Sequence, residues 1–517
     1  MQTWIWFVVF AFRWWNALWV KTFFQPDEFY QSLEVAHHLV FGYGFLTWEW
    51  RNSIRSGLHP LIFATLYRLL KVLGWDSNYT IMLCAPRILQ GTFAAILDYG
   101  TYQFALHRYG RRAARWTLAC SLFSYFNAYV GVRTFANSLE TTLTALALWQ
   151  WQKYLKLVSQ SQTKTIHNPN LKFRALIWFI IFIGIAFLIR PTNLLVWVVP
   201  TLLWTTSPKV SFLRPSLIFA RVRQLVLEVL NHLPEITAVT SAIFIFNVLV
   251  DRYVYGRFVF PIVSFFNFNV TSGLSSLYGV NSSHYYLSQA IPIICGGYIV
   301  FLLLSFDLQA IFAVGFILLP YSFIAHKEFR FVYPLSPIIL SAIGNGLASV
   351  SSKWIRRAFV IISTVHIGVA IVLCRYHQLG AAEVMPLIHS LAAQNKTGII
   401  LAPCHTTPWQ SQIHVPIADH TWRFLTCEPF EHPFDETNRF YLDMPAYLDQ
   451  LDAYPDYLVF FEERLPSLEK YFHSKGLLYN EFARYFNSWI PESEERRGNL
   501  LVYEKQYESF NEGKSRI

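Results

Sequence analysis

Apolar runs of about twenty residues recur along the chain, and this feature limits the possible folds more than any other. An α-helix of that length spans the hydrocarbon core of a bilayer. Only 14% of the 517 residues are charged, compared with about 25% in an average soluble domain. A spanning segment must satisfy its own backbone hydrogen bonds, which leaves helices or closed barrels. The length of the runs therefore predicts a mainly α-helical protein that crosses the membrane many times.

We expect about eleven spans, judged by their length and lack of charge. They cover residues 4–22, 81–106, 116–133, 139–155, 175–190, 192–206, 226–250, 289–305, 308–325, 331–349 and 358–374. The first run is a helix rather than a cleavable signal peptide, because Arg13 interrupts it and no small-residue cleavage site follows. Segment 59–75 is apolar but carries Arg68 and Lys71. We expect it to lie along the luminal membrane surface as an amphipathic helix.

The loops between the spans fall into two sets. Basic residues collect in one set, which the positive-inside rule places in the cytosol: 107–115, 156–174, 207–225 and 350–357. This distribution accounts for the net charge of +10, so we expect no nucleic-acid partner. The other set holds the N-x-S/T sequons, which mark luminal loops: Asn78, Asn269, Asn281 and Asn395. The two criteria agree on the side of each loop.

The composition changes after residue 374. Residues 1–374 form the predicted membrane domain, with a first luminal loop at 23–80, and residues 375–517 are charged and hold short strand-like stretches. We expect this tail to be a small α/β luminal domain. Its two cysteines, Cys404 and Cys427, lie in an oxidising compartment and could form a disulfide. Their separation in sequence does not decide whether they are close in space.

The first luminal loop is rich in side chains of the kinds used in catalysis and binding. Asp27 follows a proline directly after the first span, and Glu28 comes next. An acid at that position can cap a helix or act as a catalytic base, and residue types alone leave both open. Further polar and aromatic candidates for substrate contact follow in the same loop: Glu34, His38, Trp48, Glu49 and Arg55.

A second polar cluster, His326, Lys327, Glu328 and Arg330, separates two apolar runs. A charge in mid-bilayer costs about 2.5–3.5 kcal/mol, so the cluster should lie at the interface or line a wet cavity. A short turn between spans does not need so many charges. Glycosyl transfer from a lipid phosphate needs one base and cations for the leaving group. A carboxylate and this cluster on one side of the membrane would suffice.

Several stretches together resemble one family. QPDEFYQSLEVAHH, GYGFLTWEW and HKEFRFVYPLSP resemble the dolichyl-phosphate-mannose-dependent α-mannosyltransferases of glycosyltransferase family 22, which have the GT-C fold. The similarity extends over nearly the whole chain. The tail stretch PCHTTPWQSQIHVP resembles the branch that acts on the glycosylphosphatidylinositol (GPI) precursor.

The resemblance implies transfer of mannose from dolichyl phosphate mannose to the second mannose of the GPI precursor, forming an α-1,2 link with inversion. It places the protein in the endoplasmic reticulum membrane, with the active site in the lumen and no metal or cofactor in the transfer step. Asp27 matches the catalytic aspartate and Glu28 the adjacent acid. The motif residues His326, Lys327, Glu328 and Arg330 would bind the donor phosphate and sugar. Gln25 stands where the family usually has histidine.

Two alternatives remain. The chain could be another family 22 mannosyltransferase, acting in assembly of the lipid-linked N-glycan precursor. A transporter or scramblase is the alternative outside the family. It would predict interrupted helices at the bilayer midplane and an internal repeat, and the sequence indicates neither.

Overall fold

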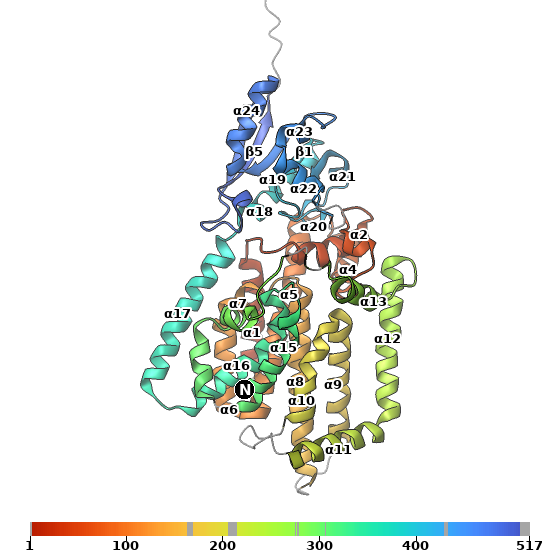
Figure 1. Cartoon of the computed structure of the whole chain (residues 1–517), viewed down its shortest axis with the longest axis vertical. Coiled ribbons are helices and arrows are strands. Elements are labelled where there is room, and N and C mark those ends of the chain that lie inside the picture. The colour runs from red at the N-terminus through yellow and green to blue at the C-terminus, as the bar shows by residue number, and fades with distance from the viewer. Residues whose placement is uncertain are drawn as a thin grey trace, which may run out of the picture.

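A computed structural model describes residues 3–162, 169–204, 215–274, 276, 279–305, 307–428 and 433–506. The predicted cytosolic loops 156–174 and 207–225 thus lie partly outside the described residues. A helical membrane part fills one end of the molecule and an α/β part the other, as Figure 1 shows. The prediction of a mainly helical membrane protein with a small α/β tail is confirmed.

Helices and short 3-10 or π-helical segments (η) make up the membrane part. In chain order they are α1 Thr3–Trp19, η1 Phe29–Leu33, α2 Glu34–Phe41, α3 Trp48–Arg51, α4 Leu58–Val72, α5 Tyr79–Tyr109, α6 Arg111–Phe123, α7 Tyr125–Tyr129, α8 Ala136–Gln162, α9 Pro169–Ile189, η2 Pro191–Trp197, α10 Val198–Leu203, α11 Pro215–Asn231, α12 Leu233–Tyr255, α13 Pro261–Phe266, η3 Asn267–Thr271, η5 Tyr286–Ala290, α14 Ile291–Cys295, η6 Gly296–Leu304, α15 Leu308–Phe323, η7 Phe329–Leu335, α16 Ser336–Ser349 and α17 Lys353–Arg375.

Six helical stretches of the described residues are long and apolar enough to cross a membrane: Tyr79–Tyr109, Pro169–Ile189, Leu233–Tyr255, Tyr286–Leu304, Phe329–Ser349 and Lys353–Arg375. Each overlaps a predicted span, and the number eleven stays a prediction. One predicted boundary is wrong. The span expected at 226–250 begins inside α11, which runs along the lower edge in Figure 1, and the apolar helix α12 starts only at Leu233. The break comes at His232 because Pro234, early in α12, has no N–H to continue the α11 ladder.

Helix α16 is the centre of the membrane part. Of the apolar window in Phe329–Ser349, 83% is buried within the protein, against 11% for α12, which stands apart in Figure 1. Glycines allow the close packing around α16, as small residues do in membrane bundles. A Cβ on Gly344 would lie 2.2 Å from Thr117 Oγ1, and one on Gly346 would lie 2.5 Å from the Phe301 carbonyl oxygen.

A buried ion pair joins α1 to α5. Arg13 Nε lies 2.7 Å from Asp98 Oδ2, and the two side chains are 1% and 0% exposed. Arg13 also donates to the Ser121 carbonyl, and the Ser121 hydroxyl donates to Asp98. In apolar surroundings an unpaired charge is far more costly than a satisfied pair. The pair therefore fixes the position of α1, from which the first loop leaves the membrane.

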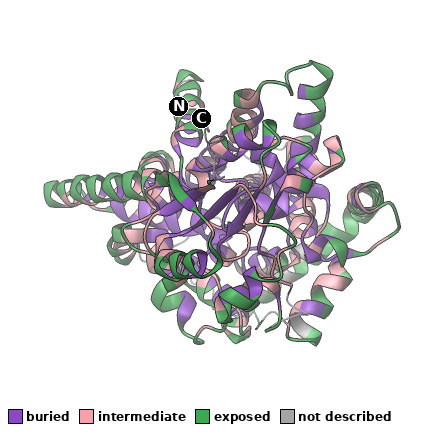
Figure 2. Cartoon of the chain, turned by 90° about the horizontal axis from the view of Figure 1, so that it is seen from above, coloured by how far each residue is buried: buried purple, intermediate pink, exposed green. Residues whose placement is uncertain are grey.

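The α/β part contains a five-stranded sheet in the order β2-β1-β3-β5-β4, with β1 parallel to β2 and β3, and β5 antiparallel to β3 and β4. Its elements are α18 Gly380–Glu383, α19 Met385–Ala393, β1 Gly398–Leu401, α20 Gln410–Ile413, α21 Ala418–Thr421, β2 Trp422–Phe424, α22 Glu436–Leu442, α23 Met444–Leu448, β3 Tyr457–Phe461, η8 Glu462–Arg464, α24 Leu465–Lys475, β4 Tyr479–Tyr485, η9 Glu494–Arg496 and β5 Leu500–Lys505. The central strands are buried among exposed helices, as the view from above in Figure 2 shows.

The α/β part rests on the first loop, residues 23–80, through a shared apolar core. Phe29, Tyr30 and Leu33 of the loop pack in one cluster with Ile400 and Trp409. The segment after β1, residues 403–414, therefore lies directly on η1 and α2. This contact brings the tail of the chain next to the residues that follow the first span.

Replacing Asp98 by leucine tests the buried pair. The variant leaves the Arg13 charge unpaired in apolar surroundings, so we expect a loss of about 3–5 kcal/mol of stability. Thermal unfolding of the detergent-solubilised protein measures the loss. The double variant Arg13→Met/Asp98→Leu removes both charges and should recover most of it. Equal unfolding temperatures for the single and double variants would contradict this interpretation.

Candidate active site

A cavity of about 630 Å³ lies where the membrane part meets the α/β part. Three stretches form most of its wall. The first loop contributes Gln25, Asp27, Tyr30, Gln31, Trp48, Glu49 and Arg55, the turn after α15 and the start of η7 contribute residues 326–330, and the α/β part contributes Cys404, His405, Cys427, Glu492 and Arg496. The fold thus joins both polar clusters that the sequence singles out.

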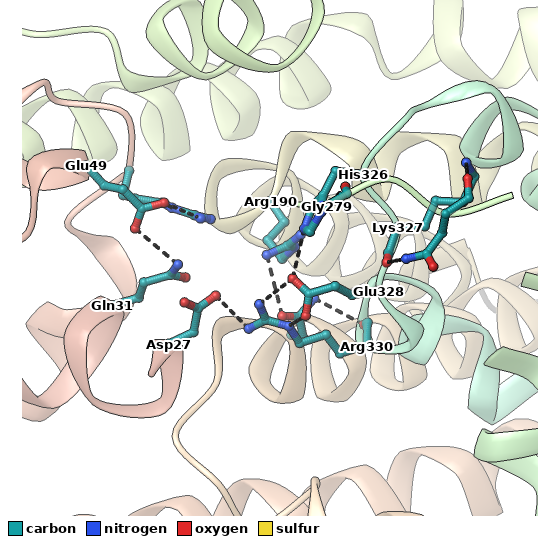
Figure 3. Close-up of polar contacts among 12 residues, drawn as sticks. Asp27, Gln31, Glu49, Arg190, Gly279, His326, Lys327, Glu328 and Arg330 are labelled. Atoms are coloured by element: carbon teal, nitrogen blue, oxygen red, sulfur yellow. Dashed lines mark hydrogen bonds and ion pairs between the residues drawn. The ribbon is translucent and has the colours of Figure 1, made fainter. Parts of the chain in front are cut away.

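A continuous chain of charges crosses the floor of this cavity (Figure 3). Arg330 Nη1 lies 2.6 Å from Asp27 Oδ2, and Arg330 Nε lies 2.6 Å from Glu328 Oε2. His326 Nε2 in turn lies 3.1 Å from Glu328 Oε1. Although burial opposes its ionisation, the charge of Arg330 lowers the pKa of Glu328 well below its usual range. Asp27, which is far away in sequence, therefore forms one unit with His326, Glu328 and Arg330.

Glu28 has a different environment from its neighbour. Its carboxylate lies 2.7 Å from Arg133 Nη1, and Arg133 also donates to the carbonyl and hydroxyl oxygens of Thr22. Glu28 is not one of the described residues that line the cavity, whereas Asp27 is. The two adjacent acids thus have different roles: Asp27 faces the cavity, and Glu28 anchors the loop to the connection between α7 and α8.

The opposite wall is built from the remainder of the first loop. Arg55 Nη2 pairs with Glu49 Oε1 at 2.7 Å, and Gln31 Nε2 donates to Glu49 Oε2 at 3.1 Å. Trp48 packs against Phe268 with ring centroids 4.8 Å apart. The sequence analysis missed Gln31. Its place four residues after Asp27, a spacing that brings helical side chains to one face, could have identified it.

The cavity has an excess of positive charge. Among its described lining residues, five are lysine or arginine and four are aspartate or glutamate. Arg190 has its carboxylate partner, Glu140, behind the wall at 3.2 Å. Lys327 Nζ donates to the Asn281 carbonyl at 2.7 Å, and no carboxylate of the described residues lies within ion-pair distance of it. Among the described lining residues, Lys327 is therefore a cation without a carboxylate partner.

The four sequons differ in their surroundings. Asn78 and Asn395 are exposed. Asn269 and Asn281 line the cavity, and their side-chain amides already donate to the carbonyls of Phe265 and Lys327. A glycan on either would have to disturb the cavity wall, so the first pair are the accessible sites.

Glu34 and His38, predicted as substrate residues, lie outside the cavity lining. The buried Glu34 carboxylate accepts hydrogen bonds from the Trp409 N–H, the Ser411 N–H and the Ser411 hydroxyl at 2.9, 3.1 and 2.5 Å. His38 Nδ1 contacts the Gly44 carbonyl oxygen at 3.2 Å. Glu34 of the first loop therefore holds segment 403–414 in place through these hydrogen bonds.

A disulfide joins Cys404 to Cys427, with Cα atoms 5.8 Å apart. It borders the cavity and lies beside His405. Potential metal-ligand atoms of these three residues lie within 4.8 Å of one another. Thiolates rather than disulfide sulfurs bind metals, so the bonded pair does not offer its sulfurs as ligands.

The overall fold is found in known structures. Crystal structures of ArnT from Cupriavidus metallidurans, in the apo state and bound to undecaprenyl phosphate, match this chain with a TM-score of 0.56. The matches cover 96% of this chain and 97% of that chain at 11% and 12% identity. The chain thus has the GT-C fold.

The sequence places the chain more narrowly. Residues 4–414 match the model of the Alg9-like mannosyltransferase family, and the chain belongs to that family. It is 58% identical to GPI mannosyltransferase 3 of Schizosaccharomyces pombe over 98% of this chain and 100% of that protein. It is 31% identical to GPI alpha-1,2-mannosyltransferase 3 of Homo sapiens over 96% of this chain and 86% of that protein. The predicted resemblance to family 22 is confirmed.

Replacing Glu34 by glutamine tests the contact between the first loop and segment 403–414. Burial raises the pKa of Glu34 to about 7, against the hydrogen bonds from Ser411 and Trp409. An unfolded glutamate has a pKa of about 4.3. Between these values the folded chain binds more protons than the unfolded chain, so its stability falls as the pH rises. We expect a loss of up to about 3 kcal/mol between pH 4.3 and 7, and little further change above pH 7.

Glu34→Gln keeps a hydrogen-bond acceptor but does not titrate. Unfolding temperatures of the wild type and the variant should therefore be compared at pH 5, 6, 7 and 8. The wild type should lose stability relative to the variant as the pH rises to 7. A difference that does not depend on pH would show that Glu34 does not carry this pKa.

Proposed function

We propose that this protein transfers mannose from dolichyl phosphate mannose to the 2-hydroxyl of the second mannose of the GPI precursor, forming an α-1,2 link on the luminal face of the endoplasmic reticulum membrane. The names of the relatives support this activity over one in N-glycan precursor assembly. The alternative of a transporter or scramblase has no support from the family.

One observation carries the mechanism: Asp27 and the cationic turn at 326–330 meet in a single cavity. Arg330 holds Asp27 by Oδ2, and no described side chain donates to Oδ1. This oxygen can therefore accept the proton of the acceptor hydroxyl as a general base. The fixed ion pair keeps the carboxylate in one orientation, which positions the base before the substrates arrive.

In the proposed step, the acceptor oxygen forms a bond to C1 of the donor mannose while the bond from C1 to the phosphate oxygen breaks. The proton of the acceptor hydroxyl passes to Asp27, and the phosphate leaves with the electron pair of the broken bond. Attack from the face opposite the phosphate inverts the configuration at C1, as in inverting glycosidases. Asp27 and the phosphate therefore lie on opposite sides of the sugar.

The departing phosphate gains negative charge and needs cations rather than an acid. We assign Lys327 as its main partner, because the charge of Arg330 is shared by Asp27 and Glu328. Burial opposes protonation of His326, but the hydrogen bond to Glu328 raises the pKa of His326 above its usual value. We assign His326 as a second partner for the phosphate because it belongs to the same turn as Lys327. These side chains stabilise the negative charge of the phosphate, and the scheme requires no metal or organic cofactor.

Replacing Asp27 by asparagine removes the base but keeps the shape of the side chain. We expect mannosyl transfer to fall by at least about 100-fold while the protein still accumulates in the membrane. Microsomes supplied with labelled donor and GPI acceptor measure the rate, and digestion with an α-1,2-specific mannosidase identifies the product.

The matched control is Glu28→Gln, one residue along. Because Glu28 pairs with Arg133 outside the cavity, this variant should lower the amount of folded protein but retain transfer per folded molecule within about fivefold, a small part of the effect of removing a general base. Near-normal transfer by Asp27→Asn would refute the assignment of the base. Failure of the wild type to form the product would refute the proposed function itself.

Replacing Lys327 by methionine removes the proposed phosphate partner. A lost charge-assisted hydrogen bond costs about 1.5–3 kcal/mol, so kcat/KM for the donor should fall about 10- to 100-fold. Inhibition by dolichyl phosphate should weaken in parallel. Arg51, an exposed cation that pairs with Glu428 outside the cavity lining, provides the control Arg51→Met. Unchanged dolichyl phosphate inhibition in Lys327→Met would exclude this contact.

A further inference from the structure

His405 is a cavity residue that the scheme above does not use. It comes from the α/β part, in the segment that follows β1, and lines the same cavity as Asp27. The two side chains are close enough that the charge of Asp27 acts on the titration of His405. The α/β part, which carries His405, lies at the end of the molecule opposite the membrane helices (Figure 1).

The backbone at His405 is held in an uncommon conformation. Its φ of +55° lies in the left-handed region, which residues other than glycine seldom adopt and which concentrates at functional sites. The disulfide at Cys404 fixes the preceding residue. The Tyr30 ring packs edge-on against the imidazole at 4.4 Å, and the Tyr30 hydroxyl donates to the Thr407 carbonyl at 3.0 Å. These contacts hold the ring in a single position.

One nitrogen of this fixed ring has no partner. Nδ1 lies 3.7 Å from Cys427 Sγ, whereas Nε2 is buried and makes no hydrogen bond to any described residue. Buried polar atoms are nearly always satisfied, so an unpaired nitrogen on a residue that lines the cavity can serve to bind a polar substrate group. Burial lowers the pKa of His405 to about 4, with the charge of Asp27 opposing the shift. A neutral imidazole is suited to a hydroxyl group rather than to a phosphate.

We propose that His405 positions the acceptor, with Nε2 forming a hydrogen bond to a non-reacting hydroxyl of the acceptor mannose so that its 2-hydroxyl faces Asp27. The inference rests on the proposed function and deepens it. The donor phosphate is assigned to the turn that carries Lys327, so the wall that carries His405 is left for the acceptor. Recognition of the acceptor would then depend on the α/β part.

The test compares His405→Phe with His405→Gln. Phenylalanine keeps a ring against Tyr30 but removes both nitrogens, whereas the glutamine amide can replace Nε2. We expect His405→Phe to raise the acceptor KM about tenfold, with the donor KM within about twofold of wild type. His405→Gln should recover most of the acceptor affinity. An unchanged acceptor KM in His405→Phe, or equal rises in both KM values, would overturn the proposal.

The matched control is His414→Phe. His414 lies in the same segment with a φ of +49°, but it contacts His37 and the Asp76 carbonyl rather than the cavity. This variant should reduce stability while leaving the acceptor KM within about twofold of wild type. A rise equal to that of His405→Phe would mean that placement of the segment, not the imidazole, is responsible, and would also overturn the proposal.

Deoxy acceptors identify the contact itself. Acceptors lacking the 3-, 4- or 6-hydroxyl of the reacting mannose are each assayed with the wild type and His405→Phe. For one of these deoxy acceptors, the wild type should have a higher KM than for the parent acceptor. His405→Phe should have the same KM for both acceptors, because the effects of removing two groups that contact each other are not additive. Additive losses for all three would exclude a hydrogen bond from His405. If the wild type forms no product at all, the proposed function fails and not this inference alone.

Discussion

The ion pair between Asp27 and Arg330 is the contact on which the arrangement of the site depends. It joins the loop after the first span to the turn before α16, two segments separated by most of the membrane part. Arg330 is shared with Glu328, so this one guanidinium orients a carboxylate on each side. Each flank of the pair is anchored separately: Glu28 holds the loop to Arg133, and α16 is embedded among its neighbouring helices. A proposed base can therefore keep its geometry while its surroundings accept two lipid-linked substrates.

The distribution of charges follows from the cost of burying them. The buried pair of Arg13 with Asp98 is joined by two hydrogen bonds and has a structural role, because an unpaired charge in apolar surroundings is strongly destabilising. Polar groups that face the cavity are satisfied less completely. Asp27 keeps one oxygen free of described donors, Lys327 has no described carboxylate partner, and His405 has an unpaired Nε2. The polar groups with unused hydrogen-bonding or ion-pairing capacity are the ones to which substrate groups are proposed to bind.

The sequence predicted the helical class, the α/β tail and both polar clusters, because apolar run length and charge in an apolar context are local properties. It could not separate Asp27 from Glu28, since their roles depend on Arg133, more than a hundred residues away. It placed Glu34 with the substrate residues, because the segment that satisfies Glu34 comes from the tail. His405 was not predicted as a site residue for the same reason, because only the docking of the tail on the first loop brings it to the cavity. The boundary near residue 226 was wrong because α11 and α12 are apolar neighbours that a proline separates.

The central claim is that the donor sugar lies between Asp27 and the cationic turn. A structure of the protein with bound dolichyl phosphate mannose tests this most directly. We expect the phosphate to lie within hydrogen-bond distance of Lys327 Nζ, with C1 of the mannose between that phosphate and the Asp27 carboxylate. A phosphate bound elsewhere in the cavity, or a sugar whose C1 turns the phosphate toward Asp27, would contradict it.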